Sequence, residues 1–267
     1  MNKSASIESG FQGGVRLRNP ESPIQTDRPL ISVITVVKNG VATLEQALNS
    51  VLGQTYAPLE YIVYDGGSRD GTLDLLRRYD DRITYWCSQA DAGLYDAMNR
   101  AVDGARGDWL LFLGADDLLR PGFSAAAAQC REANTLYYGD VYLPHRGRFY
   151  DGRFSAAKLA RQNICQQAIF YPRAVFAQYR FDTRYSILAD WALNMRCHHD
   201  ARFRFHYVPE VIAEFNDRTG VSSLRKDDQF LRDYLALLRA NFSPLIFWWR
   251  RMVRTAGWPL RAAGLLR

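Results

Sequence analysis

The amino-acid sequence predicts an α/β fold in which a mostly parallel central sheet is flanked by helices. Between residues 30 and 113, short apolar runs rich in β-branched residues alternate with amphipathic helical patterns. Hydrophobic residues make up 48% of the 267 residues and charged residues 23%, which excludes a disordered, collagen-like or coiled-coil chain. In such folds the ligand lies beyond the carboxyl ends of the strands, so we expect the chemistry where strands end.

The elements are predicted in order from residue 29. Residues 30–37 (LISVITVV) form a β-branched apolar run that suits a strand buried on both faces. Between residues 44 and 52, apolar side chains recur at i, i+3, i+4, i+7 and i+8, which predicts a helix. The alternation continues with strands at 59–64, 83–86 and 109–113 and helices at 72–79 and 94–105. After Gly122 we expect a helix, short strands at 135–143 and 148–150, and a mixed segment to residue 241.

Composition divides the chain into four segments. Residues 1–28 carry no periodicity and are expected to be a flexible lead-in without chemistry, whereas residues 29–121 and 122–242 form the two halves of one merged domain. There is no apolar run of signal-peptide length at the N-terminus and no run of about 18 apolar residues anywhere, so neither secretion nor a membrane span is expected. The net charge of +6 favours acidic partners such as phosphates, nucleotides or an anionic membrane.

The fourth segment, residues 243–267, has the composition of a helix that lies in a membrane interface. It contains five arginines, three tryptophans and no acidic residue. Arginines attract anionic head groups and tryptophans favour the boundary between lipid and water. The alternative is a terminal helix that packs on the core.

Several functional classes are excluded by missing motifs. The first strand is not followed by G-x-G-x-x-G or by G-x-x-x-x-G-K-[ST], which makes NAD-linked redox chemistry and P-loop ATP hydrolysis unlikely candidates. The four cysteines have no Cys-x-x-Cys spacing, so we expect neither a disulfide framework nor a zinc site, and a reducing cytoplasm is the simplest compartment. No nucleic-acid-binding motif is present.

Carboxylates follow the predicted strands at three places. Asp65 stands in YDGGSRDGT, Asp91 in DAGLYDAMN, and Asp116 and Asp117 in FLGADD. Adjacent acids repel each other unless a cation joins them, and oxygen ligands suit Mg²⁺ or Mn²⁺. The alternative for Asp117 is a cap on the helix predicted after Pro121.

The run from residue 30 to residue 117 resembles the nucleotide-sugar-binding half of family 2 glycosyltransferases, which have the GT-A fold and act in bacterial surface polysaccharide synthesis. The stretches that carry the resemblance are ISVITVVKN, SVLGQTY, EYIVYDGGSRDGT and DAGLYDAMNRAVDGARGDWLLFLGADD. The resemblance implies an inverting transferase that uses a UDP- or GDP-sugar and a divalent metal. It also implies that residues 29–121 form a Rossmann-like half that binds the nucleotide sugar, and that residues 122–242 bind the acceptor.

The resemblance carries site residues over by position. Asp91 would lie near the base or ribose, and Asp116 would be the carboxylate of a D-x-D motif on the metal side, with help from Asp117. Gly114 stands where many relatives have the first Asp of that motif. The expected nucleotide-sugar-binding residues are Thr35, Val37, Asn39, Asp65, Ser68, Asp91 and Asp116.

The resemblance also implies a general base at the start of a helix in the acceptor half. Asp190, in SILADWALNMRC, is the best positional match, and its apolar neighbours are expected to raise its pKa by desolvation. The alternative is that Asp190 caps this helix, and Asp182 and Asp200 compete for the role of base. Two further departures are Gln166, where the family often has His, and Thr219, which replaces the first Gly of a Gly-Gly-x-Ser loop.

These observations predict a cytoplasmic enzyme, peripheral at the inner face of the plasma membrane, that adds a sugar to a glycan or to a lipid-diphosphate-linked acceptor. The partners expected are the nucleotide sugar, that acceptor and an anionic membrane surface, and no nucleic acid. Two rivals remain: a nucleotidyltransferase, and a catalytically degenerate scaffold at the membrane.

Overall fold

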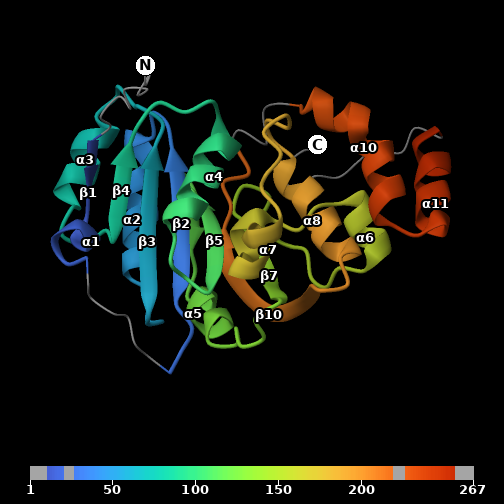
Figure 1. The fold of residues 1–267 in the computed structure, drawn as a ribbon, viewed down its shortest axis with the longest axis horizontal. Coiled ribbons are helices and arrows are strands. Elements are labelled where there is room, and N and C mark those ends of the chain that lie inside the picture. The colour runs from blue at the N-terminus through green and yellow to red at the C-terminus, as the bar shows by residue number, and fades with distance from the viewer. Residues whose placement is uncertain (1–10, 21–26, 219–225, 256–267) are drawn as a thin grey trace, which may run out of the picture.

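The computed structural model describes residues 11–20, 27–218 and 226–255. Within these ranges the strands are β1 (Phe11–Gly13), β2 (Ile31–Val37), β3 (Leu59–Asp65), β4 (Tyr85–Ser88), β5 (Trp109–Gly114), β6 (Leu118–Leu119), β7 (Thr135–Leu143), β8 (Arg148–Tyr150), β9 (Ile169–Pro172) and β10 (Arg204–Glu214). They form one sheet in the order β1-β4-β3-β2-β5-β9-β7-β10-β6, with β8 paired to β7 (Figure 1).

The centre of the sheet is parallel, as the sequence predicts. Strands β4, β3, β2 and β5 run in one direction, and β7 and β10 are parallel to each other. Strand β9 is antiparallel to both of its neighbours, β5 and β7, and so joins the two parallel groups. Because β2 to β5 are parallel, their carboxyl ends meet at one edge of the sheet.

Helices cover both faces of the sheet. They are α1 (Val15–Arg18), α2 (Val41–Leu52), α3 (Thr72–Arg78), α4 (Leu94–Gly104), α5 (Gly122–Ala127), α6 (Ala156–Arg161), α7 (Arg173–Gln178), α8 (Ala189–His199), α10 (Asp228–Asn241) and α11 (Pro244–Thr255). Helices α2, α3 and α5 bury their apolar side chains against one face, whereas α4, α7, α8 and α10 pack into the core of the other. Among the described residues, no helix has both the length and the apolar character needed to span a bilayer.

Most predicted elements are present, several within one residue of the expected bounds. Strands β7 and β8 have the predicted bounds. Strand β4 begins two residues later than expected, at Tyr85, because it pairs with the second half of β3, from Ile62↔Tyr85 to Asp65↔Ser88.

The prediction that order begins near Pro29 is wrong for residues 11–18. Strand β1 pairs antiparallel with β4, and α1 follows it. Arg16 in α1 places its Nη1 atom 3.0 Å from Oε1 of Glu60, a β3 residue that is 1% exposed. The N-terminal segment is therefore attached to the sheet edge by strand pairing and by a buried ion pair.

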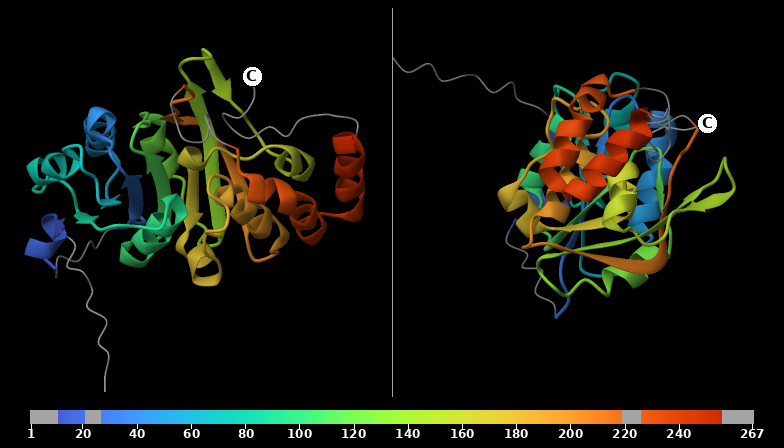
Figure 2. Two further views of the ribbon diagram at one scale, coloured as in Figure 1. Left: turned by 90° about the horizontal axis from the view of Figure 1, so that it is seen from above. Right: turned by 90° about the vertical axis from the view of Figure 1, so that its right-hand side faces the viewer.

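The C-terminal helices form the end of the molecule opposite β1 and α1. Helix α11 packs on α10 and α6 and lies at the outer edge in Figure 1 and in the left view of Figure 2.

Candidate active site

The ends of the parallel strands bring the predicted donor-side residues to one edge of the sheet. Val37 at the end of β2 pairs with Asp65 at the end of β3, which in turn pairs with Ser88 at the end of β4. Gly114, the last residue of β5, pairs with a β2 residue of the same edge. Thr35 lies one step inside, fully buried, with its Oγ1 3.1 Å from the hydroxyl of a buried tyrosine. The side chains of Thr35 and Val37 therefore belong to the core beneath the edge.

Asp65 holds together the loops that follow β2 and β3. Its buried carboxylate accepts hydrogen bonds from Ser88 Oγ at 2.6 Å, from Ser68 N at 3.0 Å and from Ser68 Oγ. Ser68 Oγ in turn accepts from Asn39 N at 2.6 Å, and Asn39 Oδ1 accepts from Arg69 N at 2.9 Å. Asn39 has φ of 54°, a left-handed conformation that asparagine tolerates. The two loops thus form one hydrogen-bonded unit at the sheet edge.

Asp91 lies directly against the DGG loop. A Cβ atom placed on Gly66 would be 2.2 Å from Asp91 Oδ2, so a larger residue there would displace the Asp91 carboxylate. The other oxygen of Asp91 accepts a hydrogen bond from Gly93 N at 3.0 Å, just before α4. The structure therefore brings Asp65, Asp91 and the small residues between them into contact.

Asp116 and Asp117 follow β5 and are held by two amide side chains. Asn216 donates from Nδ2 to Asp116 at 3.1 Å and from its backbone N to Asp117 at 2.8 Å, and Gln167 Nε2 donates to Asp117 at 2.7 Å. Burial raises the pKa of both carboxyl groups, and the charge of Asp116 raises the pKa of Asp117 further. Asp117 is not a helix cap, because Pro121 occupies the N-cap of α5.

The departure at Gly114 has a steric reason. A Cβ atom there would lie 2.4 Å from Asp117 Oδ2 and 3.1 Å from Asp116 Oδ1. With the two carboxylates in this position, residue 114 has no room for an aspartate side chain. In the described part of the chain, no group of three or more His, Cys, Asp or Glu gathers around a possible metal position. Asp116 and Asp117 are a pair and do not make up such a group.

Asp190 is a buried carboxylate in the first turn of α8. It is 7% exposed, and its oxygens lie 2.9 Å from Tyr95 Oη and 2.6 Å from Asn163 Nδ2. Leu188, not Asp190, occupies the N-cap of α8, so the capping alternative is wrong. Desolvation by burial raises the pKa of Asp190 to about 6, against which the hydrogen bonds from Tyr95 and Asn163 act.

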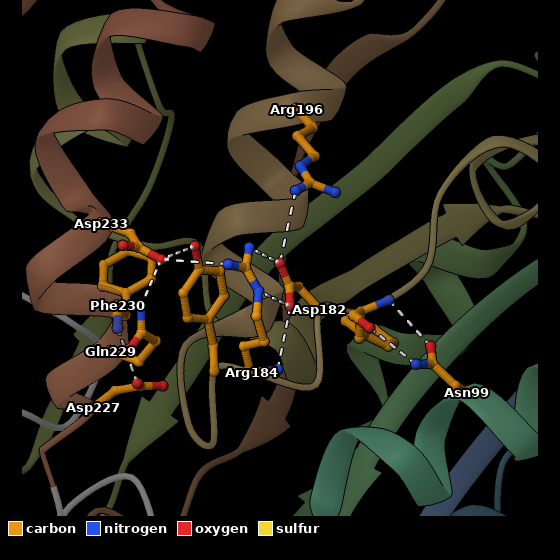
Figure 3. A network of polar contacts seen from close by, with 10 residues as sticks. Asn99, Asp182, Arg184, Arg196, Asp227, Gln229, Phe230 and Asp233 are labelled. Atoms are coloured by element: carbon orange, nitrogen blue, oxygen red, sulfur yellow. Dashed lines mark hydrogen bonds and ion pairs between the residues drawn. The ribbon is translucent and has the colours of Figure 1, made fainter.

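The two competitors for the role of base are ion-paired instead. Asp182 lies 2.8 Å from Arg184 and 3.8 Å from Arg196, and its hydrogen bonds to Arg184 lower its pKa (Figure 3). Asp200, which ends α8, lies 2.6 Å from Arg202, whose hydrogen bond lowers the pKa of Asp200. A carboxylate with a lowered pKa and an arginine partner is a poor proton acceptor.

Asp227 fixes the start of the helix that carries Asp190. Its Oδ2 accepts from the backbone N atoms of Ile187 at 2.8 Å and Leu188 at 3.0 Å, while its Oδ1 caps α10 by accepting from Phe230 N at 3.1 Å (Figure 3). Unpaired amides at two helix starts are thus satisfied by one buried side chain.

Sequence reasoning missed the amide and phenol side chains of the site. Gln167 is adjacent to Gln166, which was singled out, but Gln166 itself donates only weakly, to Met98 Sδ at 3.6 Å. Asn216 lies in the segment expected to form a loop, while Thr219 of that segment is outside the described residues. A signal existed for Asn216, since polar residues directly after a strand often face a site, but none existed for Asn163.

Comparisons with known proteins show the family of this chain. Residues 32–212 match the family described as Glycosyl transferase family 2. The PGL/p-HBAD biosynthesis glycosyltransferase of Mycobacterium bovis is 37% identical over 214 residues, which cover 76% of this chain and 83% of that protein. An uncharacterized glycosyltransferase of Mycobacterium tuberculosis is 40% identical over 106 residues, 39% of this chain and 40% of that protein.

Solved structures show the same fold. The mannosyltransferase PcManGT from Pyrobaculum calidifontis, in complex with GDP-Man and Mn²⁺, superposes with a TM-score of 0.61 at 17% identity and covers 90% of this chain and 84% of its own. S. aureus TarS in complex with UDP-GlcNAc has a TM-score of 0.59 at 18% identity over 79% of this chain. This chain spans 64% of that TarS chain. The predicted GT-A fold is confirmed, and the chain belongs to glycosyl transferase family 2.

Proposed function

We propose that this glycosyltransferase moves a hexose from a UDP- or GDP-sugar, with inversion at the anomeric carbon, to a hydroxyl of a glycan or lipid-diphosphate-linked acceptor in polysaccharide biosynthesis. The observation that carries the proposal is Asp190, whose buried carboxylate has a pKa of about 6. A base with a pKa near the working pH is both ionised and able to take a proton, as general base catalysis requires.

The reaction needs one proton transfer and one displacement. The acceptor hydroxyl gives its proton to the Asp190 carboxylate while its oxygen forms a bond to the anomeric carbon. The bond from that carbon to the diphosphate oxygen breaks, and the nucleoside diphosphate leaves with the electron pair. Because attack comes from the face opposite the leaving group, a single displacement inverts the configuration.

The strand-end loops are proposed to hold the donor. Asp65, Ser68 and Asn39 are linked by hydrogen bonds at one edge of the sheet, and Asp91 lies against Gly66 at the same edge. TarS binds UDP-GlcNAc and PcManGT binds GDP-Man. These two donors support a uridine or guanosine diphosphate sugar for this chain as well.

Asp116 and Asp117 are proposed to hold Mg²⁺ or Mn²⁺. Two adjacent, largely buried carboxylates repel each other when ionised, which is why the pKa of Asp117 is raised beyond the effect of burial alone. Oxygen ligands of this kind fit a hard divalent cation. The cation would neutralise charge on the departing diphosphate. Asn216 and Gln167 orient the two carboxylates for it.

Helix α11 supports an acceptor at an anionic membrane surface. Leu245, Trp248, Trp249 and Met252 are 80%, 53%, 37% and 62% exposed and recur at i, i+3, i+4 and i+7, so they form one apolar stripe on the outer face of the helix. Arg251 is exposed beside the stripe, with its guanidinium 5.0 Å from the ring of Trp248. Basic and aromatic side chains around an apolar helix face favour an interfacial position.

Calorimetric titration and a transfer assay test the donor, metal and base assignments separately. We expect UDP or GDP to bind wild type more tightly with Mn²⁺ than without it, and Asp116→Ala to lose that metal-dependent gain. Asp190→Asn should bind the same nucleotide as wild type but lose at least about 100-fold in transfer. Wild-type turnover in Asp190→Asn would remove Asp190 from the mechanism, and metal-independent binding in wild type would remove the cation.

A further inference from the structure

A chain of hydrogen bonds leads through the core to one oxygen of Asp190. Tyr171 Oη on β9 donates to Asn194 Oδ1 at 2.9 Å, Asn194 Nδ2 on α8 donates to Asn163 Oδ1 at 2.9 Å, and Asn163 Nδ2 donates to Asp190 Oδ2 at 2.6 Å. All four side chains are buried, with exposures between 0% and 7%. Asn194 lies four residues after Asp190, so the two share a face of α8.

The direction of this chain of hydrogen bonds is fixed by which groups can donate and which can only accept. An ionised carboxylate accepts hydrogen bonds and cannot donate, so Asn163 must turn its NH₂ group toward Asp190. Its carbonyl oxygen then faces Asn194, which must donate, and the carbonyl oxygen of Asn194 must accept from Tyr171. Every dipole of the chain therefore points its positive end toward Asp190 Oδ2.

The other oxygen of Asp190 has a different environment. Tyr95 Oη lies 2.9 Å from Asp190 Oδ1 and 2.6 Å from the backbone oxygen of Ile187. A phenol has one proton, and the backbone oxygen can only accept. While Asp190 is ionised, Tyr95 donates to Oδ1; once Oδ1 is protonated, Tyr95 can donate to the Ile187 oxygen instead and accept from Oδ1. Protonation of Asp190 is therefore favoured at Oδ1, where Tyr95 can accept a hydrogen bond, and disfavoured at Oδ2, where the NH₂ group of Asn163 can only donate.

We propose that Asn163, held by Asn194 and Tyr171, is a positioning residue for the base: it occupies Oδ2 and leaves Oδ1 as the oxygen that takes the acceptor's proton. The proposal rests on the proposed function, in which Asp190 is the base. It goes further, because it assigns different roles to the two oxygens and explains why two amides and a phenol are buried behind the site.

Four buried acids lie within electrostatic reach of Asp190. Burial raises the pKa of Tyr95 from α4, Tyr150 from β8, Cys165 from the loop before η1 (Gln166–Ala168) and Tyr171 from β9, and the charge of Asp190 raises each further. Each stays protonated at neutral pH, since burial also raises its pKa. Because these four acids carry no charge, it is hydrogen-bond donors among the described residues that stabilise the ionised carboxylate of Asp190.

The test is a direct titration of Asp190 that needs no substrate. The ¹³Cγ resonances of labelled aspartates are followed from pH 4 to 9 in the full chain, and the Asp190 signal is assigned by its loss in Asp190→Asn. Relative to wild type, the midpoint should rise by about 0.5 pH unit in Tyr171→Phe and by about 1 unit in Asn194→Leu, because a weaker donor at Oδ2 stabilises the ionised form less.

The matched control is Tyr137→Phe. Tyr137 is also a buried tyrosine of the sheet, but its hydroxyl accepts from Arg131 N and Glu132 N and its ring belongs to the core on the other face. It should leave the midpoint of Asp190 unchanged. Tyr171→Phe keeps the test valid if Asn194→Leu does not fold. An unchanged midpoint in Tyr171→Phe and in every folded variant at Asn194 would overturn the proposal.

Kinetics separate this proposal from the proposed function. Release of UDP from UDP-glucose or of GDP from GDP-mannose, in the absence of an acceptor, is measured against pH for the same variants. The acid limb of kcat should move upward with the NMR midpoint, while the KM for the donor stays constant. A rate that falls equally at every pH would indicate a merely structural role and overturn the proposal. Full activity in Asp190→Asn would overturn the base assignment itself, whatever the NMR midpoints are.

Discussion

At the scale of single residues, Asp190 combines a stability cost with a proposed catalytic use. Burial raises its pKa from 3.8 to about 6 in the folded chain. The folded state therefore binds the proton more tightly than the unfolded state, and folding becomes less favourable as the pH rises between these two values. Asp190→Asn removes this cost, because its NH₂ group can donate to Tyr95 and its oxygen can accept from Asn163. We expect the free energy of unfolding of the variant at pH 8 to exceed that of wild type by about 2–3 kcal/mol.

Denaturant unfolding at two pH values checks this prediction. The advantage of Asp190→Asn should shrink as the pH falls from 6 and disappear below about pH 3, where the carboxyl group is protonated in both states. Asp182→Asn is the matched control with the opposite sign, because Asp182 has a lowered pKa and an arginine partner. It should lose stability at pH 8. Equal stability of wild type and Asp190→Asn at pH 8 would contradict the assigned burial of the charge.

Residue types also determine how much of the site the sequence could predict. Carboxylates such as Asp65, Asp91 and Asp116 stand out because charge directly after an apolar strand needs a reason, and the structure places all three at the sheet edge. Gln167 and Asn163 carry no charge and stand in segments without periodicity, so nothing local marks them. Their importance comes from tertiary contacts with Asp117 and Asp190, which a single sequence does not display.

At the scale of elements, the N-terminal segment depends on one buried ion pair. The Glu60 carboxylate accepts from Arg16 Nη1 at 3.0 Å, from Ser32 Oγ at 2.5 Å and from Arg106 N at 2.8 Å. Arg16→Ala leaves that buried charge without its cation, so we expect a loss of about 3 kcal/mol in the free energy of unfolding. Urea unfolding followed by tryptophan fluorescence measures it.

Arg18→Ala is the control on the same short helix. Arg18 pairs with Asp80, but its side chain is 51% exposed, so its removal should cost less than about 1 kcal/mol. If the two substitutions cost the same, the Arg16 to Glu60 pair does not hold the N-terminal segment in place.

The difference between local sequence patterns and long-range contacts explains which elements could be predicted. Strands β2, β7 and β8 follow from β-branched and aromatic runs, whose local pattern survives in the fold. Strand β1 has three residues and no such pattern, and it is ordered by pairing with β4 and by Arg16, 44 residues away from its partner Glu60. Long-range contacts of this kind override a local sequence that reads as flexible.

At the scale of the whole molecule, exposed apolar residues are found at both ends, and others lie on α2, α4 and β8. Leu245 and Trp248 are on α11, whereas Phe11 and Leu17, which are 57% and 47% exposed, are on β1 and α1 (Figure 1). At the α11 end Arg251 lies beside a stripe at helical spacing, whereas at the other end Arg77 lies over the ring of Phe11, 5.1 Å from its centroid. The inner face of α11 is packed, because Arg250 is 1% exposed and donates from Nε to Tyr234 Oη at 3.1 Å. The packed inner face agrees with the alternative of a terminal helix that packs on the core, and the exposed stripe is the surface that we propose for the membrane. Residues 256–267 of the predicted tail lie outside the described residues.

Contact of the α11 end with a membrane surface can be tested without deleting the helix. A deletion would also remove the packing of Arg250 on Tyr234. Leu245→Glu combined with Trp248→Glu should lower sedimentation with vesicles of phosphatidylcholine and phosphatidylglycerol at least about tenfold, because each apolar side chain contributes roughly 1.5–3 kcal/mol on burial and each new carboxylate repels the anionic lipid. Phe11→Glu combined with Leu17→Glu makes the same change in charge at the other end, on β1 and α1, and it should sediment like wild type. Binding of wild type should also weaken on vesicles of phosphatidylcholine alone, since the basic flank then has no anionic head group to meet. An equal loss in both double variants would mean that charge alone determines the attraction, and an unchanged α11 variant would mean that the membrane meets another face of the enzyme.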